Sequence, residues 1–205
     1  MSLLPIFVKL QRRQVVVVGG GAIAEGKLSA LFAAGSHIRV VAPEITKGIA
    51  QEVSQGRAEW RQKQFDSADL DGAFLVIAAT SAPGVNEAVY READARGILC
   101  NAVDDIERCH FYYGSVVQRG DLQIAISTNG KSPALAQRLR LQLEQQFGPE
   151  YELWLEWLGA ARELLRAGDD TPESKKILLH HLASRPMFER FVQESRGEKA
   201  LRGGA

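Results

Sequence analysis

The 205-residue chain is poor in cysteine, in long apolar runs and in net charge. Its two cysteines are too few for a disulfide framework, which excludes the small secreted disulfide-rich class. The 25 basic side chains equal the 25 acidic ones, so no overall positive field predicts a nucleic acid or an anionic membrane as partner. No apolar run approaches the roughly 20 residues of a membrane span, and the first residues lack a signal-peptide pattern. We expect a cytoplasmic protein.

Metal-ligand spacings are missing as well. The sequence contains no C-x-x-C and no H-E-x-x-H motif, so we expect no resident metal. His110 directly follows Cys109 and is either a residue that meets a metal ion in transit or a structural residue of the antiparallel ribbon expected at 110–128; the second interpretation is favoured. His180 and His181 face two directions on a helix and are interpreted as surface residues.

Apolar runs alternate with helical patterns over the first hundred residues. The run at 15–19, VVVVG, is almost entirely β-branched, as in a parallel strand buried on both faces. Further strands are expected at 37–43, 57–62, 73–80 and 98–103, and helices at 20–35, 45–56 and 83–97. Strands that alternate with helices predict the α/β class, with a parallel, doubly wound sheet.

The pattern changes after residue 105. Residues 110–128 read as an antiparallel ribbon, two strands joined by a tight Arg-Gly-Asp turn. A helix is expected at 132–149, with Ser132 as N-cap and leucines along one face. Because an isolated two-stranded ribbon is marginal in water, the ribbon and this helix need a partner surface. A second copy of the chain is the simplest partner, and we expect a homodimer.

Helical patterns continue to about residue 195, and Thr171-Pro172-Glu173 marks one helix start. The last ten residues are expected to form a frayed tail. The sequence therefore predicts three parts, which are an α/β domain at 1–109, a small α+β dimerisation segment at 110–147 and a C-terminal helical domain at 148–205.

The segment VVVVGGGAIAEGK carries the G-x-G-x-x-A form of the dinucleotide fingerprint. Gly19 permits the turn from strand to helix, Gly21 lets a pyrophosphate approach the backbone, and Ala24 allows close helix packing. The helix then presents free N–H groups to the phosphates. This predicts a Rossmann NAD-binding domain whose cofactor contacts are Gly19, Gly21, Ala22, Ile23 and Ala24. The alternative is a glycine turn without a ligand.

An acidic residue usually ends the second strand and binds the adenosine ribose. Here Ala42 stands at that position, and Glu44 follows two residues later. No arginine comes soon enough after the strand to suggest a pocket for a 2′-phosphate. We therefore expect NAD rather than NADP, with Pro43 and Glu44 beside the ribose.

Three further polar residues end strands at the same edge of the predicted sheet. Ligands of open α/β sheets bind outside the carboxyl ends of the strands. Thr80 and Asn101 lie at such ends and are expected to contact the cofactor, and Asp104 follows the fifth strand. From spacing alone, Asp104 and Asp105 are equally well explained as the start of a loop.

Several segments stand out by their order and spacing over residues 3–145: GGGAIAEGK, AAT (78–80), Asn86, CNAVDD (100–105), CHF (109–111) and ISTNGKSPALAQRLR (126–140). Together they resemble the precorrin-2 dehydrogenase/sirohydrochlorin ferrochelatase family of sirohaem synthesis, which occurs alone or as the N-terminal module of a larger synthase. The last segment is not a general Rossmann feature, which makes the resemblance specific.

The resemblance implies a homodimer that oxidises precorrin-2 to sirohydrochlorin with NAD⁺. Some members of the family also insert Fe²⁺, so Fe²⁺ or Co²⁺ as a substrate ion stays open. The family's key aspartate falls on Asp104, a general base for the substrate proton. Its substrate loop falls on Ser127, Thr128, Asn129, Gly130 and Lys131. Where many members have a proline after the aromatic pair, this chain has Gly114, a departure that concerns the ribbon.

The substrate carries many carboxylates, so an electrically neutral chain must offer local positive charge. Lys131, Arg138 and Arg140 are candidates, although the two arginines are equally well explained as a solvated helix face. Two other functions remain as alternatives. A regulatory NAD-binding dimer leaves CNAVDD and ISTNGKSPALA without a role. A reductase for a small carbonyl compound needs a proton donor after the fourth or fifth strand, and none is evident.

Overall fold

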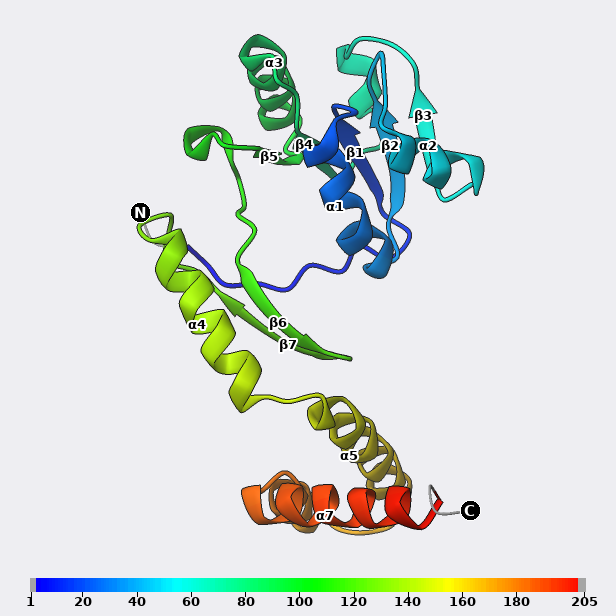
Figure 1. Ribbon diagram of the computed structural model, residues 1–205, viewed down its shortest axis with the longest axis vertical. Coiled ribbons are helices and arrows are strands. Elements are labelled where there is room, and N and C mark those ends of the chain that lie inside the picture. The colour runs from blue at the N-terminus through cyan, green and yellow to red at the C-terminus, as the bar shows by residue number, and fades with distance from the viewer. Residues whose placement is uncertain (1–2, 203–205) are drawn as a thin grey trace. The chain divides into compact units, whose positions relative to one another are not determined.

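The computed structural model describes residues 3–202, which divide into two compact units on either side of the Tyr113–Gly114 bond (Figure 1). This division is close to the first predicted domain boundary; the three-part organisation itself stays a prediction. No helix within the described residues is long and apolar enough to cross a membrane.

The first unit is a parallel five-stranded sheet with helices on both faces (Figure 1). Its strands are β1 (Gln14–Val18), β2 (His37–Val41), β3 (Ala58–Arg61), β4 (Leu75–Ala78) and β5 (Leu99–Ala102). Its helices are α1 (Ala22–Ala33), α2 (Lys47–Ser54) and α3 (Pro83–Ala95), with two short 3₁₀ turns, η1 (Ser67–Leu70) and η2 (Ile106–Arg108). The spatial order β3-β2-β1-β4-β5 reverses direction beside β1. The predicted doubly wound sheet is confirmed, and its switch point lies between β1 and β4.

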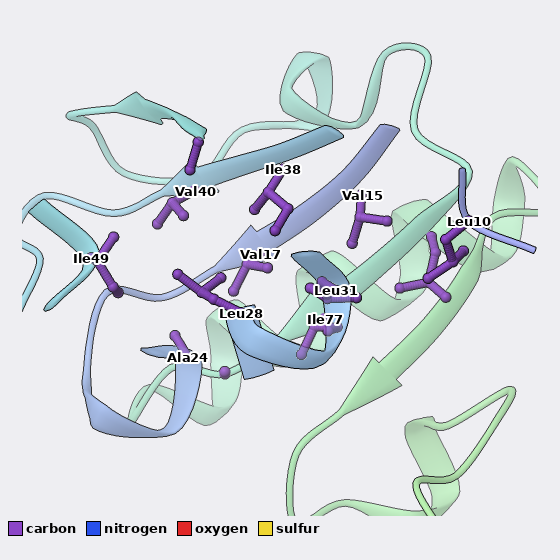
Figure 2. Close-up of a cluster of buried hydrophobic side chains, with 13 residues drawn as sticks. Leu10, Val15, Val17, Ala24, Leu28, Leu31, Ile38, Val40, Ile49 and Ile77 are labelled. Carbon is purple, nitrogen blue, oxygen red and sulfur yellow. The ribbon is translucent and has the colours of Figure 1, made fainter. Parts of the chain in front are cut away.

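The β1 strand contributes side chains to two hydrophobic clusters, one on each face of the sheet. Val15 and Val17 pack under α1 and α2, in the cluster of Figure 2, while Val16 and Val18 pack under α3 and η1. All four side chains are at most 2% exposed. A strand covered on both faces needs apolar residues at every position, which is why the run is continuous rather than alternating.

The second unit contains the predicted ribbon and four helices. Strands β6 (Ser115–Arg119) and β7 (Leu122–Ile126) pair antiparallel, and Gly120 takes the left-handed φ of +54° in the turn. The helices are α4 (Pro133–Gln146), α5 (Glu150–Ala167), α6 (Pro172–Leu182) and α7 (Arg185–Arg202). The predicted caps are present, because the hydroxyls of Ser132 and Thr171 accept backbone N–H bonds at the starts of α4 and α6.

One prediction in this unit is wrong. The sequence predicts a frayed tail from residue 196, yet α7 continues to Arg202; residues 203–205 lie outside the described part. The segment is rich in Glu, Lys, Ala, Leu and Arg, all good helix formers, and Arg190 pairs with Glu194 one turn away. Helix propensity outweighs the terminal position there.

Helix α4 is fastened to the ribbon at its C-terminal end. The Arg119 guanidinium donates from Nε to the Phe147 carbonyl at 2.8 Å and from Nη2 to the Glu144 carbonyl at 3.2 Å. These carbonyls belong to the helix end, where no intrahelical donor remains for them. The outer side of α4 stays open, because Leu135 and Leu141 are 48% and 49% exposed.

Candidate cofactor and catalytic site

The glycine loop after β1 touches two other loops of the first unit. Gly19 has a φ of +123°, and a Cβ there would stand 2.3 Å from the Ala79 carbonyl oxygen after β4. A Cβ on Gly20 would stand 1.9 Å from the Glu44 carbonyl oxygen after β2. Real Cβ atoms do not approach so closely, so both positions require glycine. Sequence reasoning explained Gly19 and missed Gly20, whose neighbour is distant in the chain.

Gly21 differs from its two neighbours because nothing lies within 4 Å of the Cβ it lacks. It is the N-cap of α1, and no side chain caps this helix. The first N–H groups of α1 are therefore left for a ligand, and the helix dipole favours an anion there. Open space, unpaired donors and a positive helix end fit the pyrophosphate of a dinucleotide.

The other members of the fingerprint divide into buried and open positions. Ala24 is fully buried and packs against the sheet, so its small side chain serves the close packing expected from the motif. Ala22 and Ile23 are exposed, Ile23 by 53%. Their backbone N–H groups, rather than their side chains, are the parts available to phosphates.

The loop after β2 is held against the glycine loop. The Thr46 N–H donates to the Gly20 carbonyl at 2.9 Å, and the Trp60 indole donates to the Ala42 carbonyl at 2.9 Å. Ala42 is buried, whereas Pro43 and Glu44 are exposed beside Gly20. The two residues predicted to face the ribose thus lie next to the loop predicted to hold the pyrophosphate.

The loop after β4 is fixed by a pair of polar residues. The Asn86 amide nitrogen donates to the Thr80 carbonyl at 3.0 Å, and its oxygen accepts from the Thr80 N–H at 3.2 Å. The Thr80 hydroxyl reaches the same oxygen at 2.8 Å. Asn86 entered the sequence analysis only through the resemblance; the structure assigns it the task of shaping the Thr80 turn.

Asn101, predicted as a cofactor contact, fastens the chain that returns after β5. Its side chain is buried, and its amide nitrogen donates to the Phe111 carbonyl at 2.9 Å and lies 3.4 Å from the Cys109 sulfur. Both amide hydrogens are therefore used within the protein. No local sequence signal announces this contact, because its partners are ten and eight residues away.

The two carboxylates that follow β5 have different surroundings. Asp105 forms an ion pair with Arg108, which also lies 3.7 Å from Glu87 on α3. Asp104 is exposed and makes no hydrogen bond or ion pair within residues 3–202. The Val103 N–H donates to the Ala78 carbonyl at 2.9 Å, which keeps this segment beside the end of β4.

Asp104 also has an unusual backbone. Its φ is +63°, and among the described residues only two others that are not glycine, Arg12 and Asn129, have a positive φ. Such a conformation costs on the order of 1–3 kcal/mol and is tolerated best by Asp and Asn. The chain thus presents an unpaired carboxylate on a strained turn at the carboxyl edge of the sheet.

His110 is a structural residue, but not in the ribbon where the sequence places it. The ribbon begins at Ser115, and His110 lies against β5 in the first unit. Its Nδ1 accepts from the Cys100 N–H at 3.1 Å, and its Nε2 lies 3.1 Å from the Asp94 carboxylate. No group of three or more potential metal ligands occurs within the described part of the chain.

The two cysteines are not activated nucleophiles. Burial raises the pKa of Cys100 to about 12. Burial also raises the pKa of Cys109, whose thiol lies 3.1 Å from the carbonyls of Ala102 and Asp105 and helps to hold the turn. The thiolate is the reactive form, and both sites disfavour it.

The predicted substrate loop forms a tight turn before α4 in the second unit. The Ser127 hydroxyl accepts from the Asn129 N–H at 3.1 Å, and the Thr128 hydroxyl accepts from the Ser132 N–H at 3.2 Å. Asn129 and Gly130 are both left-handed, at φ of +53° and +74°. Lys131 is exposed.

The two arginines named with Lys131 are distinguishable in the structure. Arg140 forms an ion pair with Glu144 one turn along α4, as expected of a solvated helix face. Arg138 is exposed and unpaired within the described residues. Only Lys131 and Arg138 therefore offer an uncompensated positive charge near this loop, among the side chains that the structure describes.

Comparison with known proteins agrees with this geometry. A family described as putative NAD(P)-binding matches residues 6–115, more than half of the chain, and one described as sirohaem biosynthesis protein, central, matches residues 119–146. A sirohaem synthase of Methylobacillus flagellatus is 39% identical over 203 residues, covering 99% of this chain and 42% of that protein. The chain belongs to the putative NAD(P)-binding family and is similar to the sirohaem synthases. The resemblance found in the sequence is thereby confirmed.

A second sirohaem synthase and a solved structure show the extent of the similarity. Siroheme synthase 1 of Serratia proteamaculans is 40% identical over 171 residues, which are 82% of this chain and 36% of that protein. The solved structure of SirC, a precorrin-2 dehydrogenase, superposes with a TM-score of 0.78 at 26% identity, covering 94% of this chain and 98% of SirC. The chain spans about two fifths of the length of the sirohaem synthases that it matches.

Proposed function

We propose that the chain oxidises precorrin-2 to sirohydrochlorin with NAD⁺, with Asp104 as general base. The observation that carries the proposal is the unpaired Asp104 carboxylate in left-handed backbone at the end of β5. It shares the carboxyl edge of the sheet with the open helix start at Gly21. The sirohaem synthase relatives and the likeness to SirC support this choice of substrate.

The first unit supplies the proposed NAD⁺ contacts. The backbone N–H groups at Gly21, Ala22 and Ile23 would bind the pyrophosphate, and Glu44 with Pro43 would bind the adenosine ribose. Thr80, which Asn86 holds in place, would contact the nicotinamide half of NAD⁺ on the side of β4. When bound, NAD⁺ supplies the acceptor for a hydride.

The residues of the chain then account for the remaining proton. The oxidation removes two hydrogens from precorrin-2, of which one leaves as hydride and one as a proton. A carboxylate without a partner is able to take that proton and release it to water afterwards. Asp104 has this character, whereas Asp105 is already paired with Arg108.

We further propose that Ser127, Thr128, Asn129, Gly130 and Lys131 bind the substrate. A left-handed turn with an exposed lysine suits carboxylate groups, because it presents backbone N–H groups together with a positive charge. Metal insertion is a second candidate activity of the Asp104 carboxylate, since it requires the loss of two pyrrole protons. Fe²⁺ or Co²⁺ would then be a substrate ion.

We also propose a cytoplasmic homodimer. The described cysteines are free thiols, as in a reducing compartment. The outer side of α4 leaves Leu135 and Leu141 about half exposed, and β6 leaves Val116 43% exposed. Such side chains on a ribbon and its helix are the surface that a second copy would cover.

The test is an anaerobic incubation of the purified chain with precorrin-2 and NAD⁺, followed by absorbance. We expect NADH to appear together with the sirohydrochlorin spectrum in equal amounts. A second arm adds Fe²⁺ or Co²⁺ to sirohydrochlorin and records the metallated product. NADH binding without any oxidation of precorrin-2 would overturn the proposal and favour a regulatory NAD-binding dimer.

A further inference from the structure

The end of β2 lacks the residue that normally rejects a 2′-phosphate. An acidic side chain in this place repels NADP and binds the ribose hydroxyls of NAD. Ala42 occupies the place here and is only 4% exposed. Glu44 is two residues further and exposed. A preference for NAD⁺, on which the proposed function rests, therefore calls for some further element of the structure.

Two cationic side chains follow the neighbouring strand at this edge. Arg61 ends β3 and is the register partner of Val41, the last residue of β2. The Ala42 N–H donates to the Arg61 carbonyl at 3.2 Å, and the Lys63 N–H donates to the same carbonyl at 2.9 Å. Adjacent strands lie about 4.8 Å apart, so both residues start within side-chain reach of the ribose position. Arginine beside this position usually binds a 2′-phosphate by donating hydrogen bonds to its oxygens.

Both cations are held by acidic partners instead. Arg61 Nη1 lies 3.0 Å from Asp69 Oδ1, and Arg61 Nε lies 3.0 Å from Glu59 Oε1. Lys63 Nζ lies 3.0 Å from Asp69 Oδ2 and also pairs with Asp66. Arg39 completes the group through Glu59 at 2.9 Å. Three positive and three negative side chains thus cancel.

Asp69 is the centre of this group, and it is fixed. Its side chain has no exposed surface, and it also accepts the Asp66 N–H at 3.0 Å in the capping box of η1. Burial by itself would raise the pKa of Asp69, but the bonds from Asp66, Arg61 and Lys63 outweigh it and hold the pKa below its usual range. The carboxylate stays ionised and cannot swing away from its partners.

We infer that Asp69 makes the chain selective for NAD⁺ over NADP⁺ by keeping Arg61 and Lys63 in neutral pairs at the edge where a 2′-phosphate would lie. A 2′-phosphate carries between one and two negative charges. At this edge it meets a group with no net charge and three carboxylates, so it gains no attraction that offsets its loss of water. The preference for NAD⁺ over NADP⁺ then comes from the neutralised charges of Arg61 and Lys63 rather than from an acidic residue at the end of β2.

The test measures equilibrium binding of NADH and NADPH through nicotinamide fluorescence, without any tetrapyrrole. Asp69→Asn keeps the size of the side chain and an oxygen for the Asp66 N–H, but it removes one of the two acidic partners of Arg61 and one of the two of Lys63, so both cations regain net positive charge. We expect the ratio of the NADPH and NADH dissociation constants to fall about tenfold or more, as one regained charge-assisted hydrogen bond implies. Adding Arg61→Gln to this variant should restore the wild-type ratio.

Two more variants keep the inference testable should Asp69→Asn unfold. Glu59→Gln alters a side chain that is 50% exposed and should lower the ratio in the same direction by a smaller factor. Asp71→Asn removes one of the two acidic partners of Arg96, outside the group, and should leave the ratio unchanged.

The outcomes separate the inference from the proposed function. An unchanged ratio in folded Asp69→Asn and Glu59→Gln would overturn the inference, as would wild-type protein that binds NADPH more tightly than NADH. Wild-type protein that binds neither nucleotide would instead refute the proposed cofactor site.

Discussion

The buried Asn101 amide and the Phe111 carbonyl are joined at 2.9 Å, and this bond closes the stretch of chain that contains Asp104. Two more hydrogen bonds hold the same stretch. The Cys109 thiol donates to the Ala102 carbonyl, and the His110 imidazole accepts from the Cys100 N–H. Asp104 itself is left unpaired within the described residues. The turn is thus braced at its base while its carboxylate stays available.

Replacing Asn101 distinguishes a structural role, in which it positions the turn at Asp104, from a role as a cofactor contact. Asn101→Ala removes both donors and leaves the Phe111 carbonyl without this partner, at a cost of about 1–3 kcal/mol in the free energy of unfolding. If Asn101 positions Asp104, kcat should fall while the NADH dissociation constant stays near that of the wild type. A large loss of NADH affinity with an unchanged kcat would instead support the contact predicted from the sequence.

The glycine loop predicts a separation of folding from binding. Gly19→Ala places a Cβ 2.3 Å from the Ala79 carbonyl on left-handed backbone, so we expect a strongly destabilised protein. Gly21→Val adds its side chain to open space, so the protein should fold and NADH affinity should fall steeply.

Gly26→Ala is the matched control for these two changes. Gly26 lies inside α1, and nothing stands within 4 Å of the Cβ that an alanine would add there. The substitution should raise the free energy of unfolding by about 0.5–1 kcal/mol and leave NADH affinity unchanged. Unchanged NADH affinity in folded Gly21→Val would show that the pyrophosphate lies elsewhere.

The buried Cys100 thiol predicts a loss of stability at high pH. Its pKa is about 12 in the folded chain, against about 8.5 when unfolded. The folded state keeps the proton that the unfolded state releases, so this contribution is complete below about pH 8.5 and declines as pH rises towards 12. Between pH 7 and pH 10 the loss is about 2 kcal/mol.

Urea denaturation at several pH values measures this effect. Cys100→Ala should lower stability at pH 7, because it leaves a small cavity, but it should flatten the decline between pH 8 and pH 10. Equal slopes in the two proteins would remove Cys100 as the cause.

The proposed dimer predicts a mass of about 45 kDa, twice that of the 22.5 kDa chain, in sedimentation at micromolar concentration. Leu135→Glu places a charge on the open side of α4, where the leucine is 48% exposed and its loss costs the isolated chain little. This variant should sediment as a folded monomer. A wild-type protein that is already monomeric and folded would refute the dimer.

Local patterns in the sequence were sufficient for most of the first unit and for the start of α4 in the second unit. The β-branched run of β1, Pro83 at the start of α3 and Ser132 before α4 are signals carried by a few adjacent residues, and the structure confirms each. The resemblance also led to Asp104, but no adjacent residue in the sequence predicted its left-handed backbone.

Contacts between distant loops were out of reach. The need for glycine at position 20 comes from Glu44, the shape of the Thr80 turn comes from Asn86, and the Asn101 amide is used by Phe111. Each of these depends on how strands lie beside one another, which residue spacing does not specify. Contacts between distant parts of the chain are therefore harder to predict than motifs of adjacent residues.

The most direct test of the central claim compares Asp104→Asn with Asp105→Asn in precorrin-2 oxidation. Asparagine tolerates the left-handed backbone of Asp104 and keeps its size, but it cannot accept the proton. We predict normal NADH binding and oxidation slowed by at least about a hundredfold, the low end of general-base effects. Asp105→Asn only weakens the pair with Arg108 and should be much milder. Equal rates in the two variants, or full activity of Asp104→Asn, would contradict Asp104 as the general base.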